Sequence, residues 1–224
     1  MENIQYLISI YTLLSVYFAA ALFMFLKYIY SKKSEINSTR NRLYLLYGFF
    51  LILFMVGRIF LFIFDYYLTG FEYSNISALD FLIWKIGISF QMFGYATILS
   101  LMEYRILKQK DYYILVILYF LFYIIAMISS NLEDAGIYTV VAAFFSFFIP
   151  IGYLYIGIKS EQKIRRKAFL IFLGFMIFFS AMIFDLEPVI LPLMNALNIT
   201  RIQVFIFVNI LKTGAIILFF LGFK

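Results

Sequence analysis

The sequence predicts an all-α membrane protein, a single domain over residues 1–224 with seven transmembrane helices. Of the 224 residues, 65% are hydrophobic and only 13% are charged, whereas charged residues make up about a quarter of a soluble domain. Seven segments are apolar over the roughly 20 residues that a helix needs to cross a bilayer. In addition, Lys and Arg are concentrated in every second connection between these segments.

The seven predicted spans follow each other closely, so little of the chain remains for a soluble domain. The first, fourth and fifth spans contain no charged residue, and each of the other four has a charged residue inside its apolar stretch. In chain order we expect the spans at residues 5–26, 44–66, 79–103, 112–130, 137–158, 168–190 and 202–222.

The connections predict the orientation in the membrane. Those after the first, third and fifth spans carry most of the Lys and Arg, as in "KYIYSKKSEINSTRNR" and "KSEQKIRRK". Those after the second and fourth spans, "DYYLTGFEYSNISALD" and "SSNLEDAG", carry Asp and Glu but no Lys or Arg. Because basic connections stay on the cytoplasmic side, we expect a multi-pass protein of the cell membrane with its amino terminus outside and its carboxyl terminus inside.

The absence of two residue types excludes several function classes. The chain contains no Cys and no His, which excludes thiolate nucleophiles, His-based acid–base catalysis, His-ligated haem and the usual zinc sites. We therefore expect neither an enzyme nor a metal site, and no cofactor is indicated by the aromatic residues. The net charge of +6 follows the alternation of the connections, so the lipid bilayer rather than nucleic acid is the expected partner.

A faint internal repeat emerges when the chain is compared with itself at an offset of 126 to 127 positions. If it reflects a duplication, residues 1–104 and 132–224 are halves of the same orientation, joined by the fourth helix. The matches include "YT" at residues 11–12 and 138–139, Glu35 and Glu161, Arg40 and Arg166, and "KIG" from Lys85 with "KTG" from Lys212.

The seven-span topology and this repeat resemble the transporter, opsin and receptor group of seven-helix proteins, which includes SWEET-type sugar transporters and microbial rhodopsins. The resemblance covers the whole chain. The sequence departs from individual members: it lacks the Pro-Gln dipeptide of PQ-loop transporters, and Trp84 is its single tryptophan, whereas rhodopsins pack retinal between several. The "EYR" at residues 103–105 differs in order from the acidic-Arg-Tyr motif of many receptors, and the last span has no "NPxxY".

Charged residues inside the spans are candidates for a binding site, because each costs about 2.5 to 3.5 kcal/mol to insert. They are Arg58, Lys85, Asp185 and Lys212. The repeat register places Asp185 one position beyond the match of Arg58. We therefore expect these two residues at similar depth and close enough to pair.

The sixth span ends in "DLEPVILP", where Pro188 and Pro192 are expected to kink or break the helix. Within a membrane such a break is tolerated only inside protein or beside a wet cavity. Asp185 and Glu187 flank the expected break. We therefore expect a polar chamber in the outer half of the bundle, walled by the second, third, sixth and seventh spans.

The charges of this chamber indicate its ligand. Three cations against one or two carboxylates leave a positive surplus, which favours a small anionic ligand such as a carboxylate or phosphate, with Arg58 binding it through two hydrogen bonds. The alternative is purely structural. In that case Arg58 and Asp185 form one interhelical pair, and Lys85 and Lys212 extend toward polar surroundings.

Polar neighbours complete the candidate site. Asn209 and Thr213 are four residues apart and share one face of the seventh span beside Lys212. We expect Lys212 to be held by these two residues and by Asp185. Gln91 lies on a stripe of the third span with two glycines, which close helix packing explains equally well.

Four functions are compatible with these features. A sensor or receptor would bind a ligand in the outer pocket and pass the signal to a cytoplasmic or membrane partner protein, because the chain ends two residues after the last predicted span. A small-solute transporter of parallel-repeat type would rock its halves about the same pocket. A retinal photoreceptor would use Lys212 for the Schiff base and Asp185 as counter-ion. The fourth function is that of a non-catalytic subunit of a membrane complex.

Overall fold

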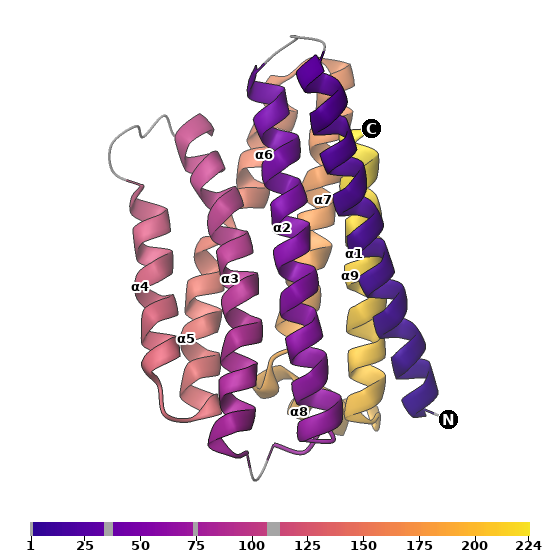
Figure 1. Ribbon diagram of the computed structural model, residues 1–224, viewed down its shortest axis with the longest axis vertical. Helices are drawn as coiled ribbons and strands as arrows, with labels where there is room; N and C mark the ends of the chain where they lie inside the picture. Colours follow the sequence, from indigo (N-terminus) through magenta and orange to yellow (C-terminus); the bar gives the residue numbers. More distant parts are fainter. Residues whose placement is uncertain (1, 34–37, 74–75, 107–112) are drawn as a thin grey trace.

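The computed structural model describes residues 2–33, 38–73, 76–106 and 113–224, and its elements are all helices (Figure 1). Within these ranges, six segments are long and apolar enough to cross a membrane. The predicted all-α architecture is confirmed, and the six long apolar segments suit a multi-pass membrane protein. In chain order the elements are α1 (Glu2–Lys33), α2 (Ser38–Phe62), the π-helical η1 (Ile63–Leu68), α3 (Ala78–Ile106), α4 (Ile114–Ile128), α5 (Leu132–Phe145), α6 (Phe148–Lys159), α7 (Gln162–Phe184), α8 (Glu187–Leu197) and α9 (Arg201–Phe223).

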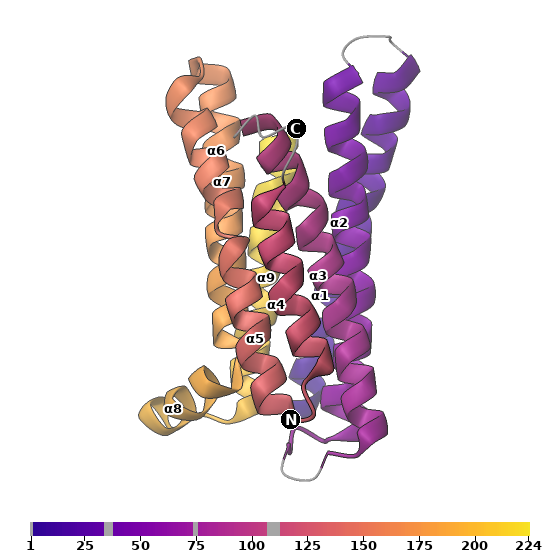
Figure 2. The same cartoon turned by 90° about the vertical axis from the view of Figure 1, so that its left-hand side faces the viewer.

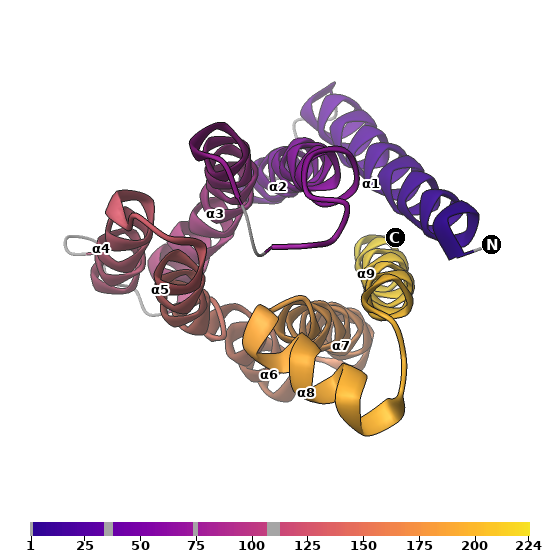
Figure 3. The same cartoon turned by 90° about the horizontal axis from the view of Figure 1, so that it is seen from below.

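The six long segments form a ring, seen along the bundle axis in Figure 3. Going round it, α1 packs against α2, α2 against α3, α3 against α6, α6 against α7, α7 against α9, and α9 again against α1. The helices α5 and α6 follow each other within one of the six segments. The shorter helix α4 lies outside the ring, where it packs against α3 and α5. The ring brings α1 and α9, which are far apart in sequence, side by side.

The two ends of the bundle hold different sets of charged residues, and Figure 2 shows which connections lie at each end. We call the upper end of Figure 2 the basic end, because it holds the α6–α7 connection with Lys159, Lys163 and Arg166. The lower end, which we call the acidic end, holds the beginning of α1, the helix η1 with Asp65, and the α7–α8 connection with Asp185. There α8 lies across the bundle axis instead of along it.

The fourth predicted span is shorter than expected. We predicted it at residues 112–130, but the described helix α4 has only 15 residues, which corresponds to about 22 Å at 1.5 Å per residue. It ends at Ile128, with Ser129 as its C-cap, because α5 begins almost at once. Asn131 is the N-cap of α5 and accepts a hydrogen bond from the backbone amide of Asp134. Six rather than seven of the predicted spans therefore reach membrane-crossing length among the described residues.

The fifth predicted span, residues 137–158, is interrupted near its middle. The chain turns at Ser146 and Phe147, between α5 and α6. Pro150 explains the interruption, because it has no backbone amide to donate to the carbonyl of Ser146 in a regular helix. Instead, Ile149 donates to that carbonyl at 2.9 Å.

Glycines bring α2 and α3 into close contact next to one of the charged residues that the sequence singles out. A Cβ added at Gly57 would lie 2.6 Å from the carbonyl oxygen of Gly87 and 2.8 Å from Cγ of Gln91. Only a residue without a side chain lets the two backbones approach this closely. The depth and direction of the adjacent Arg58 are therefore fixed by this contact.

We predict that Gly57→Ala destabilises the protein by about 1 to 3 kcal/mol, because α2 and α3 must separate to admit the methyl group. The measurement is thermal unfolding in detergent. Gly136→Ala in α5 is the matched control, since a Cβ there meets no atom within 4 Å, and its midpoint should stay unchanged or rise slightly. Equal midpoints for both variants would contradict the close contact.

Candidate functional site

The site begins with two charged residues on one face of α2 and its continuation. Arg58 and Asp65 are seven residues apart, which is about two helical turns, so they point the same way. Asp65 belongs to the π-helical η1. Its Oδ2 lies 4.0 Å from the Nη1 of Arg58. A carboxylate is thus placed beside the guanidinium by the same stretch of chain.

Asp185 joins the site because α7 ends at Phe184. Leu186, the residue after Asp185, is extended (φ −89°, ψ 134°), and α8 has Pro188 in its first turn. A proline cannot continue the hydrogen bonds of a helix interior but suits the first turn of a helix, so the sequence stops one helix and starts another here. The predicted break is confirmed at this point, whereas Pro192 lies inside α8 without ending it. The predicted span over residues 168–190 has the observed length of 23 residues but lies six residues too far along the chain, because the helix runs over Gln162–Phe184.

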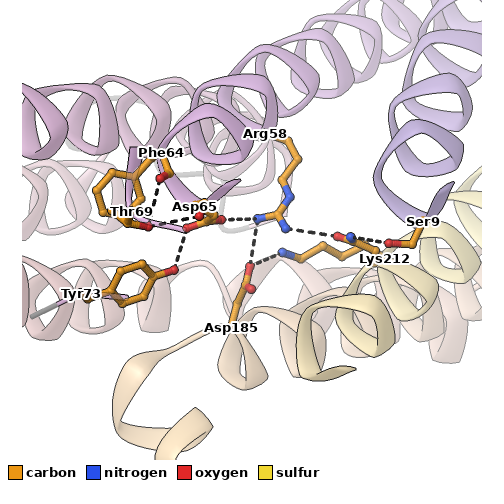
Figure 4. Close-up of polar contacts among 9 residues, drawn as sticks. Ser9, Arg58, Phe64, Asp65, Thr69, Tyr73, Asp185 and Lys212 are labelled. Atoms are coloured by element: carbon orange, nitrogen blue, oxygen red, sulfur yellow. Dashed lines mark hydrogen bonds and ion pairs between the residues drawn. The ribbon is translucent and has the colours of Figure 1, made fainter. Parts of the chain in front are cut away.

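One oxygen of Asp185 contacts two cations that come from two different helices (Figure 4). Its Oδ2 lies 2.6 Å from the Nζ of Lys212 on α9 and 3.5 Å from the Nη1 of Arg58 on α2. The predicted pairing of Arg58 with Asp185 and of Lys212 with Asp185 is therefore confirmed. Through this single carboxylate, α2, α7 and α9 are held together at the acidic end.

Asn209 extends the contacts to α1. Its side-chain oxygen accepts a hydrogen bond from Nη2 of Arg58 at 3.2 Å, and its side-chain nitrogen donates to the hydroxyl of Ser9 at 3.0 Å. We predicted that Asn209 holds Lys212, but its side chain instead orients Arg58. We call Arg58, Asp65, Asp185, Asn209 and Lys212 together the Asp185 cluster.

Asp65 is secured from outside the helices by Tyr73. The tyrosine hydroxyl donates to Oδ1 of Asp65 at 2.7 Å, and the guanidinium of Arg201 lies 4.5 Å from the centre of its ring. Burial, together with the negative charge of Asp65, raises the pKa of Tyr73 well above its ordinary value. Tyr73 therefore stays a hydrogen-bond donor over the whole physiological pH range.

The charges of the cluster are balanced. Arg58, Asp65 and Lys212 are 2%, 5% and 3% exposed, and removing one partner of such a buried pair typically costs about 3 to 5 kcal/mol. Two cations face two carboxylates, Asp65 and Asp185. The positive surplus from which we predicted an anionic ligand is absent here, because Asp65 belongs to the cluster and Lys85 does not.

Lys85 lies elsewhere and has a different role. Its ammonium donates to the carbonyls of Met127 and Ser129, both at 2.8 Å, at the end of α4. At the other end of α4, the carboxylate of Glu103 accepts from the amides of Leu115 and Val116. A cation at the carboxyl end of a helix and an anion at its amino end both interact favourably with the helix dipole and stabilise the helix. The predicted placement of Lys85 in the polar chamber is wrong, and the described side chains of α3 make no hydrogen bond or ion pair with the cluster.

The remaining predicted site residues have separate positions. Gln91 packs against Gly57 at the α2–α3 contact, and Thr213 donates to the carbonyl of Asn209 on its own helix. Glu187 is the first residue of α8, and its side chain is not among those that the structure describes. Sequence reasoning missed Ser9, Tyr73 and Asp65. Only Asp65 had a signal, its seven-residue spacing from Arg58.

Three buried polar atoms at this site have no hydrogen-bond partner in the described part of the chain. They are the hydroxyl of Tyr6, Nε of Arg58 and Oδ1 of Asp185. Buried polar atoms are nearly always paired, and an exception calls for an explanation such as a water or ligand. Together these atoms offer two donors and an acceptor. No three acidic side chains among the described residues are placed to hold a metal ion.

Comparison with known proteins gives no relative: no family model, curated protein or solved structure matches the chain.

We predict strong coupling between Lys212 and Asp185. Lys212→Met or Asp185→Asn alone should each destabilise by about 3 to 5 kcal/mol, because each leaves a buried charge uncompensated. The double variant keeps Arg58 opposite Asp65 and restores the balance, so its loss should fall short of the sum by 1 kcal/mol or more, within the usual range for contacting residues of about 0.5 to 3. Unfolding midpoints of the four proteins measure the cycle. Additive losses would mean that the two residues act independently.

Proposed function

We propose that this chain is a receptor-like membrane sensor whose ligand acts on the Asp185 cluster. One observation carries the proposal: Oδ2 of Asp185 serves both Arg58 and Lys212, while Oδ1 of the same carboxylate and Nε of Arg58 have no partner among the described residues. A carboxylate shared in this way can release one cation without leaving itself unpaired. The free atoms beside it can receive a polar ligand.

The charge balance of the cluster limits the ligand class. The cluster has no surplus of positive charge that an anionic ligand could neutralise. The ligand therefore has to replace Asp185 at Arg58, where a carboxylate can bind the guanidinium through two hydrogen bonds. The displaced Asp185 then needs a donor, because its Oδ1 already lacks one. A small carboxylic acid that also carries an amino or hydroxyl group meets both requirements. The expected anionic ligand is thereby narrowed to a carboxylate that also carries a hydrogen-bond donor.

The signal would be a change in how α7 and α8 are held. Asp185 lies between these helices, so releasing it from Arg58 frees their connection from α2. A ligand that binds the released arrangement more tightly shifts the population toward it. We propose no reaction on the ligand. The change would be received by a partner protein in the membrane or the cytoplasm.

The proposal includes seven crossings, with the acidic end outside the cell. The helix α4 is short for a crossing, but Glu103 and Lys85 of α3 satisfy backbone groups at both of its ends, as the interior of a membrane requires. The amino terminus would then be outside and the carboxyl terminus inside. The internal repeat supports two halves of equal orientation.

A transporter is the second candidate, favoured by the chain break beside the cluster. Interrupted helices commonly form the substrate sites of transporters, and Leu186 separates α7 from α8 next to Asp185. The parallel repeat would provide the two moving halves. The same ligand would then cross the membrane instead of only binding.

We predict that a small carboxylic acid with an amino or hydroxyl group stabilises the protein against thermal unfolding. In a panel of amino acids and hydroxy acids, at least one should raise the unfolding midpoint by about 5 to 10 °C at a hundredfold excess over its Kd, and its methyl ester should not. Lys212→Met should abolish the shift. Lys85→Met is the control, because it removes a lysine from a span outside the cluster. A shift that survives Lys212→Met would place the ligand elsewhere.

The same acid, tested for uptake into protein-containing liposomes, separates the two candidates. Binding without uptake supports the sensor. Uptake that depends on Lys212 would replace the sensor by the transporter.

The proposed orientation predicts which positions react with a membrane-impermeant thiol reagent in intact cells. The chain has no cysteine of its own, so each introduced one reports alone. A cysteine at the exposed Ser130 at the acidic end should react, and one at the exposed Gln162 at the basic end should react only after the cells are opened. The reverse pattern would invert the topology and turn the cluster toward the cytoplasm.

A further inference from the structure

An open pocket of about 810 Å³ lies at the basic end, between the beginning of α7 and the end of α9. Lys163, Arg166 and Lys167 line it from α7 and Lys224 from the end of the chain. Arg166 and Lys167 follow Lys163 by three and four residues, so both lie on the same face of the helix as Lys163. One carboxylate, Glu161, also borders the pocket. The mouth therefore carries a concentrated positive charge.

The amino terminus of α7 adds to this charge. Glu161 is its N-cap residue, but the side chain makes no capping hydrogen bond, and the first turn contains no acidic residue. The amides at the start of a helix and its dipole favour an anion. No carboxylate in the described ranges lies within salt-bridge distance of Lys163, Arg166 or Lys167. The positive groups are thus available to an external anion.

The inner part of the pocket is apolar. Leu170 and Leu221 line it, and Leu170 is about 10 Å farther along α7 than Lys163 at 1.5 Å per residue. The two helices meet there because of Gly222: a Cβ at this position would lie 2.5 Å from Cγ1 of Ile171 and 3.1 Å from the carbonyl oxygen of Lys167. A charged mouth is therefore followed, along the helix, by an apolar lining.

We propose that this pocket binds the headgroup of an anionic phospholipid. The cations and the helix terminus bind the lipid phosphate, and Leu170 and Leu221 contact the beginning of the acyl chains. Basic pockets between membrane helices bind lipid headgroups in this manner. The position supports a lipid over a soluble anion, because the pocket opens at the end of two membrane-crossing helices and changes from charged to apolar toward the bilayer interior. The inference is independent of the Asp185 cluster.

The test measures binding of phosphatidylglycerol and phosphatidylcholine to the purified full chain by native mass spectrometry, with thermal stability as a second readout. We expect the wild type to prefer phosphatidylglycerol. Replacing Lys163, Arg166 and Lys167 by Gln should weaken that lipid by roughly a hundredfold, at about fivefold for each cation. The control triple, Lys27, Arg42 and Lys159 to Gln, removes equal charge from the same end outside the pocket, and it should lose less than about threefold.

A second variant guards against misfolding of the triple one. Leu221→Trp obstructs the apolar part without changing charge and should also weaken phosphatidylglycerol, while leaving the protein folded. Equal losses in the two triple variants would show a general charge effect and overturn the proposal, as would equal binding of the two lipids. Stabilisation by inorganic phosphate alone to the same extent would assign the pocket to a soluble anion and overturn the lipid assignment.

Discussion

The structure depends on the carboxylate of Asp185, which compensates two cations buried on different helices. Arg58 and Lys212 are almost completely shielded from solvent, and neither is tolerable in an apolar bundle without an anion. Asp185 can reach both because α7 ends one residue earlier and the chain turns away before Pro188. The helix break and the charge compensation are therefore one feature. Together they fix how α2, α7 and α9 meet at the acidic end.

The sequence predicts those residues of the cluster that are costly to place in a membrane and can be recognised as such. A single charge inside an apolar span is expensive wherever it is, so Arg58, Asp185 and Lys212 stand out from the sequence alone. Asp65 is indicated only by its seven-residue spacing from Arg58, because it lies at the end of an apolar stretch, where a carboxylate is expected to belong to an acidic connection. The π-helical η1 keeps it on the bundle and beside Arg58. The contacts of Asn209 with Arg58 and Ser9 could not be predicted either. The position of a residue in a helix tells which residues share its face, but not which neighbouring helix packs against that face.

Lys85 and Lys212 show a second limit of sequence reasoning. They match in the repeat register, which suggests equivalent roles, yet Lys85 donates to backbone carbonyls at the end of α4 and Lys212 to a carboxylate. An alignment compares residue types, whereas the role of a lysine is set by the acceptor within its reach. The ends of α4 were unpredictable for the same reason. A 15-residue helix is acceptable in the bundle only because α3 brings Glu103 and Lys85 to its two ends.

Asp185 makes two contacts of unequal length, one within the α7–α9 pair and one across the ring to α2. The helices α7 and α9 are closely joined along their length, because a Cβ at Gly174 would lie 2.7 Å from the ring of Phe219 and one at Gly222 would meet Ile171. The 2.6 Å contact of Asp185 with Lys212 lies within this pair, whereas the 3.5 Å contact with Arg58 connects the pair to α2. Of the two, the second is longer and unsupported by adjacent glycine packing between α7 and α2. A ligand that competed for Arg58 would therefore act on the contact that crosses the ring from the α7–α9 pair to α2. Since α7 also carries Lys163, Arg166 and Lys167 at its other end, a tilt of the α7–α9 pair at the acidic end would move the basic pocket there as well.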